Sequence, residues 1–388
     1  MYPTLHRACA AIAVILLATP WASVRACPFC SRDGRTLSSE VQDAAFVVYG
    51  RLANPRVTPN ADGTETSSTE LHIEEVLKPH DYLKDKKVVM LPRYLPPIDE
   101  KQSNKCVIFC YYYQGRVDPY LMFAVKDQSF LAYLRGSLGK KQEDRMVRLK
   151  FFFDHLDNAN NEISMDAYRE FAFASYKEVR EMTEKYREPV RTKLLHWFQN
   201  RDAQLARLGL FGMMLGLCGQ PGDGYLIRDA VLDQQVVTGI DGMLAGYVML
   251  NRKEGWALLE QTLKDRRAPF HRRHAALRTV KFFLKDHPGI VAEREIWSAL
   301  GTLLDDTDLA DIAMNDLRHA KHWSHLDRIL DLEQQPSHQT PLIRKAILQY
   351  TLQCPLEKAK QYVTSQRRVD PKRVQAAEED LLYDQPPP

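Results

Sequence analysis

Ala26-Cys27-Pro28-Phe29-Cys30 is the stretch around which this chain of 388 residues is organised. Residues 1–26 have the pattern of a signal peptide, with a positive charge at Arg7 followed by a short apolar core over residues 10–18. A small residue, Ala26, precedes the expected cleavage point. We therefore predict an exported protein in the periplasm, at the cell surface or outside the cell, whose mature chain begins at Cys27.

The chain contains no stretch that is expected to cross a membrane. The apolar core of the signal is too short, and no other stretch approaches the roughly 18 consecutive apolar residues that a membrane helix needs. Val24-Arg25-Ala26-Cys27 resembles a bacterial lipoprotein box, in which the cysteine is acylated. This resemblance implies an alternative in which a lipid on Cys27 anchors the protein, although Arg25 departs from the pattern.

The charges of the protein are nearly balanced, with 53 lysine and arginine residues against 50 aspartate and glutamate residues. Its local basic clusters alternate with acidic or apolar helix positions, as solvated helix faces do. These clusters are Arg266-Arg267, Arg272-Arg273, Arg367-Arg368 and Lys372-Arg373. Such a distribution does not favour a nucleic-acid partner.

The N-terminal third of the mature chain has the pattern of a small β domain, which we place at residues 27–126. After a short helix over residues 36–43, five segments are rich in β-branched, aromatic or alternating apolar residues and are separated by polar turns. They are residues 45–52, 71–78, 88–91, 107–113 and 120–125. Five short strands predict a closed or nearly closed barrel.

Helical periodicity replaces the strand pattern from Gln128 onward. Comparable positions of successive helices recur about every 35 residues, a period typical of helical-hairpin solenoids. These positions are Ala206, Ile240, Ala275, Ala310 and Arg344. We therefore predict an α-helical solenoid over residues 127–384, followed by a disordered tail at residues 385–388. Capping pairs, Thr340-Pro341 and Asp370-Pro371, mark two helix starts.

One helix of this region, Leu205 to Cys218, is apolar on nearly all sides and carries Gly209, Gly212 and Gly216 along one edge. Because each glycine costs about 1 kcal/mol relative to alanine inside a helix, the glycines indicate close packing of a neighbouring helix. We expect this helix to be central.

The β domain resembles the netrin-like or tissue-inhibitor-of-metalloproteinase-like form of the OB barrel. The resemblance lies in the cysteine pair, in Val48-Tyr49-Gly50 and in Ile73-Glu74-Glu75-Val76-Leu77-Lys78, and the helices resemble HEAT-like repeats. The whole chain, including residues 165–172, is similar to an uncharacterised family of exported bacterial proteins with HEAT-like repeats. The inhibitor resemblance implies zinc chelation by the amine of Cys27, although those inhibitors carry Cys-x-Cys and lack the proline.

Four cysteines, Cys27, Cys30, Cys106 and Cys110, are candidates for disulfides because exported domains are commonly stapled in this way. Four cysteines allow three pairings. We expect the N-terminal pair to join the later pair, closing loops of roughly 80 residues that contribute about 4 kcal/mol each. A catalytic Cys-Pro-x-Cys pair and a zinc site are the alternatives.

No other motif indicates catalysis. Counted from Asp154 or Asp157, the stretch at residues 154–163 has no glycine at the sixth position and no glutamate at the twelfth position of a calcium loop, and it is interpreted as an inter-helix turn. His319, His322 and His325, with the acidic positions at 305–311, are interpreted as solvated. The chain has no nucleophile elbow, zinc-protease pair or phosphate-binding glycine loop, so we expect no cofactor.

These observations predict an α+β multidomain protein, an OB/netrin-like β-barrel followed by a HEAT-like solenoid. Its expected function is that of an exported, non-enzymatic scaffold that binds a protein or peptide partner. The alternatives are a thiol–disulfide oxidoreductase that uses Cys27 and Cys30, and an inhibitor of an extracellular metalloprotease.

Overall fold

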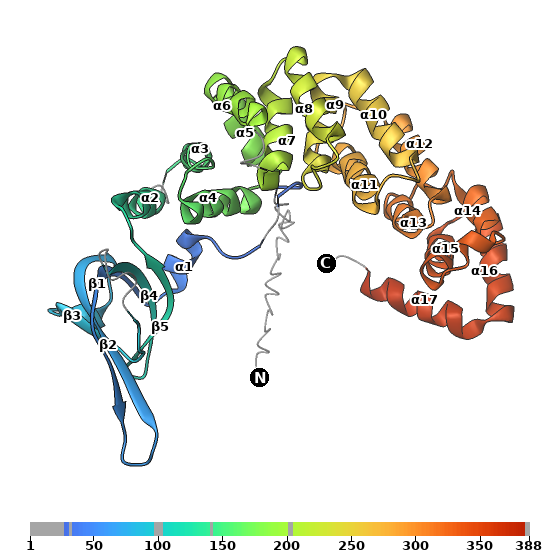
Figure 1. Cartoon of the computed structure of the whole chain (residues 1–388). Coiled ribbons are helices and arrows are strands. Elements are labelled where there is room, and N and C mark those ends of the chain that lie inside the picture. The colour runs from blue at the N-terminus through green and yellow to red at the C-terminus, as the bar shows by residue number, and fades with distance from the viewer. Residues whose placement is uncertain (1–26, 31–32, 97–103, 140–142, 201–204, 385–388) are drawn as a thin grey trace, which may run out of the picture.

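The computed structural model of the chain describes residues 27–30, 33–96, 104–139, 143–200 and 205–384. The expected signal peptide and the C-terminal tail lie outside these residues. The protein has one antiparallel sheet followed by a long series of helices (Figure 1). Its first elements are α1 (Leu37–Asp43), β1 (Phe46–Pro59), β2 (Glu65–Lys78), β3 (Val88–Leu91), β4 (Lys105–Tyr113) and β5 (Arg116–Ala124).

All five expected strands are present, and the short helix before them is α1, capped by the side chain of Thr36. The first two strands form a hairpin that is longer than expected and projects from the sheet (Figure 1). At its turn, the amide of Asn60 donates to the carbonyl of Thr64 at 2.8 Å. The outer half of β1 is largely exposed, so no apolar alternation marked it in the sequence.

The sheet is open, which corrects the expectation of a barrel. Its hydrogen-bonded order is β3-β2-β1-β4-β5, with every neighbouring pair antiparallel. Arg93 and Asp118 form an ion pair of 2.9 Å between the two edges, but no strand ladder joins β3 to β5 in the described part of the chain. A barrel needs a continuous ladder between its edge strands, and β3 has only four residues.

The two faces of the sheet belong to different cores because successive side chains of a strand point to opposite sides. Val47, Tyr49, Val107 and Phe109 join the large core that continues into the helices. The alternate residues of β1 and β4 form a separate core with β2 and β3: Phe46, Val48, Cys106, Ile108 and Cys110, with Leu71, Val89 and Leu91.

The helices α2–α17 form what we call the helical array. They are α2 (Gln128–Gly139), α3 (Arg145–Phe153), α4 (Asn161–Phe173), α5 (Tyr176–Lys185), α6 (Arg187–Gln199), α7 (Leu208–Cys218), α8 (Gly224–Leu232), α9 (Ile240–Leu250), α10 (Arg252–Lys264), α11 (Phe270–Lys285), α12 (Glu293–Thr302), α13 (Ala310–His319), α14 (Leu326–Leu332), α15 (Pro341–Gln353), α16 (Glu357–Val369) and α17 (Pro371–Tyr383). Among the described residues, no helix combines the length and the apolar character needed to traverse a bilayer.

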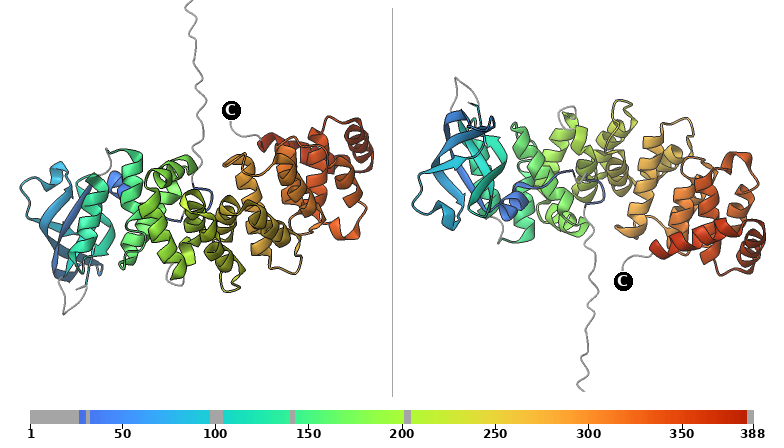
Figure 2. Two further views of the ribbon diagram at one scale, coloured as in Figure 1. Left: turned by 90° about the horizontal axis from the view of Figure 1, so that it is seen from above. Right: turned by 90° about the horizontal axis from the view of Figure 1, so that it is seen from below.

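Alternate helices of the array pack against one another. Contacts join α5 to α7, α7 to α9, α9 to α11, α13 to α15 and α15 to α17, while α6 contacts α8 and α10 contacts α12. The array follows an arch, with the sheet at one end of the elongated molecule and α14–α17 at the other (Figures 1 and 2). The five recurring positions of the sequence lie on or just before α7, α9, α11, α13 and α15.

Glycines bring α7 and α9 into backbone contact, as the sequence predicted for α7. A Cβ atom added to Gly212 would lie 2.6 Å from the Cα of Met243. On α9, a Cβ added to Gly246 would lie 1.9 Å from the carbonyl oxygen of Gly212. Only glycine permits so close an approach, so the position of α9 depends on these residues.

Candidate functional site

Cys27 and Cys30 are bonded to each other, with their Cα atoms 5.5 Å apart. Cys106 and Cys110 are free, buried thiols, so the expected cross-links between the two pairs are wrong. The reason is the alternation of β4, which directs both cysteines into the separate core of the sheet. The N-terminal pair instead belongs to the large core that the helices form.

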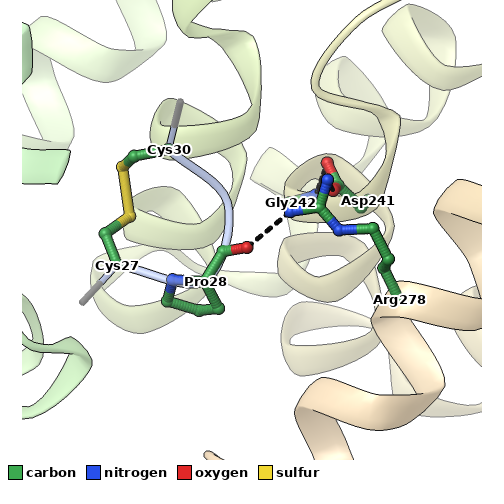
Figure 3. Close-up of a disulfide and its surroundings, with 6 residues drawn as sticks. All are labelled: Cys27, Pro28, Cys30, Asp241, Gly242 and Arg278. Carbon is green, nitrogen blue, oxygen red and sulfur yellow. Dashed lines mark hydrogen bonds and ion pairs between the residues drawn. A yellow bond between two sulfur atoms is a disulfide. The ribbon is translucent and has the colours of Figure 1, made fainter. Parts of the chain in front are cut away.

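The short loop of residues 27–30 is held between α4 and α11. The amide of Cys27 donates to the carbonyl of Ala174, just after α4, at 2.7 Å. The guanidinium of Arg278, on α11, donates to the carbonyl of Pro28 at 2.7 Å (Figure 3). The ring of Phe29 packs against that of Phe282, with the ring centroids 4.8 Å apart. The loop is thus positioned by Ala174, which is nearly 150 residues away in the chain, and by Arg278, which is 250 residues away.

The disulfide contributes less to this position than a long-range cross-link would. Closing a loop of about four residues is worth about 2 kcal/mol on the chain-entropy estimate, compared with about 4 kcal/mol for roughly 80 residues. Burying one phenylalanine side chain contributes about 1.5–3 kcal/mol, and Phe29 is buried. The noncovalent contacts of the loop are therefore at least as important as its covalent bond.

Helix α4 also binds the residues that follow the loop. Arg169 donates through Nε to the carbonyl of Asp33 at 3.0 Å. The amide of Leu37 donates to a carboxylate oxygen of Asp166 at 2.6 Å, and Ser38 donates to Glu170 at 2.8 Å. These three helix residues share one face because they are three and four positions apart. The face of α4 thus binds both the irregular segment before α1, at Asp33, and the first turn of α1.

Asp166 is fully buried, and the hydroxyl of Tyr133 donates to its second carboxylate oxygen at 2.7 Å. Burial raises the pKa of Asp166 to about 6, although its two hydrogen bonds act in the opposite direction. Glu170 raises the pKa further, while Arg169 lowers it. The carboxylate therefore joins the N-terminal segment, α2 and α4, but its charge is costly.

This cost makes stability depend on pH. The pKa of Asp166 is higher in the folded protein than in the unfolded chain. Its contribution to the free energy of unfolding is therefore complete below about pH 4 and is lost as the pH rises through about 6. The loss corresponds to about 3 kcal/mol. We expect the free energy of unfolding of the native protein to fall relative to Asp166→Asn over this interval. Denaturant titrations at several pH values measure it, and parallel profiles for the two proteins would contradict the assignment.

A cavity of about 680 Å³ lies beside the loop. Its lining combines four basic side chains, two carboxylates and several apolar groups: Arg169, His271, His274 and Arg278; Asp33 and Asp241; and Phe29, Met165, Tyr168, Val237 and Phe270. Arg278 forms an ion pair of 3.1 Å with Asp241, at the start of α9 (Figure 3). Burial lowers the pKa of His274, and Arg278 and Lys281 lower it further. The cavity thus combines apolar surface with two arginines and two carboxylates.

The two bonded cysteines differ in their access to this cavity. Cys27 is only 5% exposed, whereas Cys30 is partly exposed and lines the cavity. The free cysteines among the described residues are all buried. Burial raises the thiol pKa of Cys106, Cys110 and Cys218 to about 12, and also raises that of Cys354. These four thiols are therefore poor nucleophiles at neutral pH.

The other candidate positions from the sequence do not form a site. Residues 154–160 connect α3 to α4 and carry the cap of α4, as expected for a turn. His319 contacts Asp384, whereas His322 stacks on Trp297. Most of the acidic positions are paired with arginine: Asp306 and Asp308 with Arg273, and Asp305 with Arg328. Within the described ranges, no group of three histidine, cysteine or acidic residues has a metal-binding arrangement.

Sequence reasoning found the cysteine pair but missed the residues that surround it. Arg278 is half exposed and contacts Pro28 and Asp241, which the sequence around it does not indicate. Asp166 and Arg169 belong to the 165–172 stretch that supports the family resemblance, yet nothing in that stretch indicates that it binds residues 33–38. No local signal could have revealed these contacts, because they join distant segments.

No family model, no curated protein and no solved structure matches the chain. The role of the cavity and of its disulfide is therefore inferred from their own residues.

Proposed function

We propose that the protein is an exported interaction protein that binds a polypeptide partner in the cavity beside the Cys27–Cys30 loop. One observation carries this proposal: helices of the array already bind the irregular polypeptide before α1, at Cys27, Pro28 and Asp33, through its backbone groups. On the bound segment, the groups that make these hydrogen bonds are backbone carbonyls and amides, which every polypeptide carries.

The composition of the cavity suits the same kind of ligand. Its apolar side chains can bury those of a partner, and its arginines can donate to backbone carbonyls or carboxylates. Val237 and Phe270 line the cavity and are 58% and 48% exposed. Large exposed apolar residues beside a cavity are typical of interaction sites.

The finer assignments of the fold and of the compartment are also proposals. The alternate packing of α7, α9 and α11 and the recurrence near 35 residues support HEAT-like repeats. The five antiparallel strands, although their sheet is open, support an OB/netrin-like domain. Export rests on the signal pattern of residues 1–26, and membership of the uncharacterised exported family rests on the sequence resemblance.

The position of Cys27 favours binding over two alternatives. Its amide donates to Ala174 and its residue is 5% exposed, whereas an inhibitor that chelates zinc through this amine must present it to the solvent. Its sulfur is bonded to Cys30, whereas a lipid anchor would require that sulfur for acylation. Both observations support a mature protein that neither chelates zinc through the amine of Cys27 nor carries a lipid on its sulfur.

Site-specific photo-crosslinking tests the proposal. A benzophenone amino acid at Val237 is expected to give a discrete adduct in the native cell envelope. The same residue at Val369, which is 77% exposed at the end of α16, is the matched control and is expected to give none. Because binding requires an open cavity, Ala206→Trp should abolish the adduct, whereas Ala257→Trp, at an exposed position on α10, should not. Equal labelling from both valines would contradict the proposal.

A further inference from the structure

Of the two bonded cysteines, only Cys30 lines the cavity. Cys27 lies in the large core and is held by its amide at the end of α4. A thiolate that enters the cavity therefore meets Cys30 and not Cys27. Cys27 is then the sulfur displaced, because exchange breaks the bond opposite the attacking group.

The contacts that hold residues 27–29 in place do not involve the two sulfur atoms. The contacts of Cys27 with Ala174, of Pro28 with Arg278 and of Phe29 with Phe282 involve two backbone groups and a neighbouring ring. All three remain available when the two sulfurs are reduced. The two thiols are thus kept close together, as reformation of the disulfide requires.

The location of Cys30 at the cavity also distinguishes the Cys27–Cys30 pair from the other cysteines of the described residues as the pair that can react with a thiol in the folded protein. Arg169 and Arg278 line the same cavity as Cys30, and their side chains can donate hydrogen bonds to a thiolate, although Asp33 and Asp241 line it too. The other four cysteines are buried, away from this cavity. A thiol reagent that acts on the folded protein is therefore limited to one pair.

We propose that the Cys27–Cys30 disulfide exchanges with the thiols of a cysteine-containing polypeptide that binds in the cavity, an inference that rests on the proposed function. A partner thiolate attacks Sγ of Cys30, a partner–Cys30 bond forms, and Cys27 leaves as a thiolate that takes up a proton. A second partner thiolate then attacks the partner sulfur of this mixed disulfide and releases Cys30. The partner loses two electrons and two protons and becomes a disulfide, and Cys27 and Cys30 gain them and become thiols.

The first experiment mixes the oxidised full chain with an excess of a synthetic peptide that carries two cysteine thiols. After alkylation, mass spectrometry is expected to show peptide disulfide and reduced Cys27 and Cys30 in equal amounts, with the four buried cysteines unmodified. The same mixture in denaturant is the control, which shows that the peptide thiols can reduce the Cys27–Cys30 bond once the protein is unfolded. A bond that exchanges in denaturant but stays oxidised in the folded protein would overturn the proposal.

The second experiment tests which sulfur reacts. A peptide cysteine activated by thionitrobenzoate forms the same mixed disulfide with a free thiol of the protein and releases a coloured product. Cys27→Ser, which leaves Cys30 free, is expected to react at least about tenfold faster than Cys30→Ser, because Cys27 is buried. Circular dichroism checks that both variants are folded. Equal rates, or a faster Cys30→Ser variant, would refute attack at Cys30.

The third comparison separates this inference from the proposed function. The double variant Cys27→Ser, Cys30→Ser should retain the crosslink from Val237 while it loses all exchange. If the crosslink persists and the native protein exchanges with nothing, binding stands and exchange is refuted. If the crosslink is absent and a small dithiol exchanges as fast as the peptide, the cavity binds no polypeptide, and both claims about the partner fail.

Discussion

Gly246→Ala is expected to destabilise the helical array strongly, although alanine is the better helix former. Inside an unconstrained helix this change would gain about 1 kcal/mol. Here the new Cβ would lie 1.9 Å from the carbonyl oxygen and 2.6 Å from the carbonyl carbon of Gly212. Both atoms belong to the backbone of α7, so no side chain can rotate away, and the two helices must separate. We expect a net loss of about 3 kcal/mol.

Gly222→Ala is the matched control, because a Cβ there meets nothing within 4 Å. Its effect should stay within about 0.5 kcal/mol. Denaturant unfolding followed by the fluorescence of Trp197, Trp256, Trp297 and Trp323 reports on the array, since all four lie within it. A Gly246→Ala protein as stable as the control would show that α7 and α9 do not touch as described.

Phe29→Ala is the second change with a large expected effect, a loss of about 3–5 kcal/mol. Phe29 is 6% exposed and contacts Phe282, which in turn meets Tyr176 edge-on at a centroid distance of 5.0 Å. Its removal leaves a void where the N-terminal loop meets α11. The cavity also loses part of its wall, so the crosslink from Val237 should weaken in the same variant.

Phe173→Ala removes a ring of the same size that is 46% exposed at the end of α4, and it should cost far less. The double serine variant of the disulfide is a second comparison, with an expected loss of about 2 kcal/mol. Measured by urea unfolding, the losses should fall in the order Phe29→Ala, double serine, Phe173→Ala. If the double serine variant is the least stable of the three, the covalent bond, and not the ring, anchors the loop.

The N-terminal segment makes the sheet and the array parts of one core. It runs from the disulfide along α4 to α1, and the large core includes Phe29, Leu37, Val47 and Val107 together with the helices (Figure 1). The loop thus closes one side of the cavity while the following residues connect that cavity to the sheet. Binding or exchange in the cavity therefore acts on the segment that joins the two parts of the molecule.

The sequence by itself determined the local structure, because the forces responsible act between residues close together in the chain. Segments rich in β-branched, aromatic or alternating apolar residues predicted all five strands, and the capping pairs predicted two helix starts. Thr340 does accept from the amide of Ile343, and Asp370 from that of Arg373. The glycines of α7 predicted a close neighbour, since glycine within a helix needs such a reason.

Only the tertiary structure decided which distant groups meet. Whether Cys106 faces Cys27 depends on which side of the sheet the helices cover, and one position along a strand reverses that side. The contacts of Leu37 with Asp166 and of Pro28 with Arg278 span 129 and 250 residues. Such contacts depend on the packing of every helix between them, and no local pattern of residues encodes them. The disulfide pairing, the open sheet and the cavity were therefore beyond the reach of local patterns.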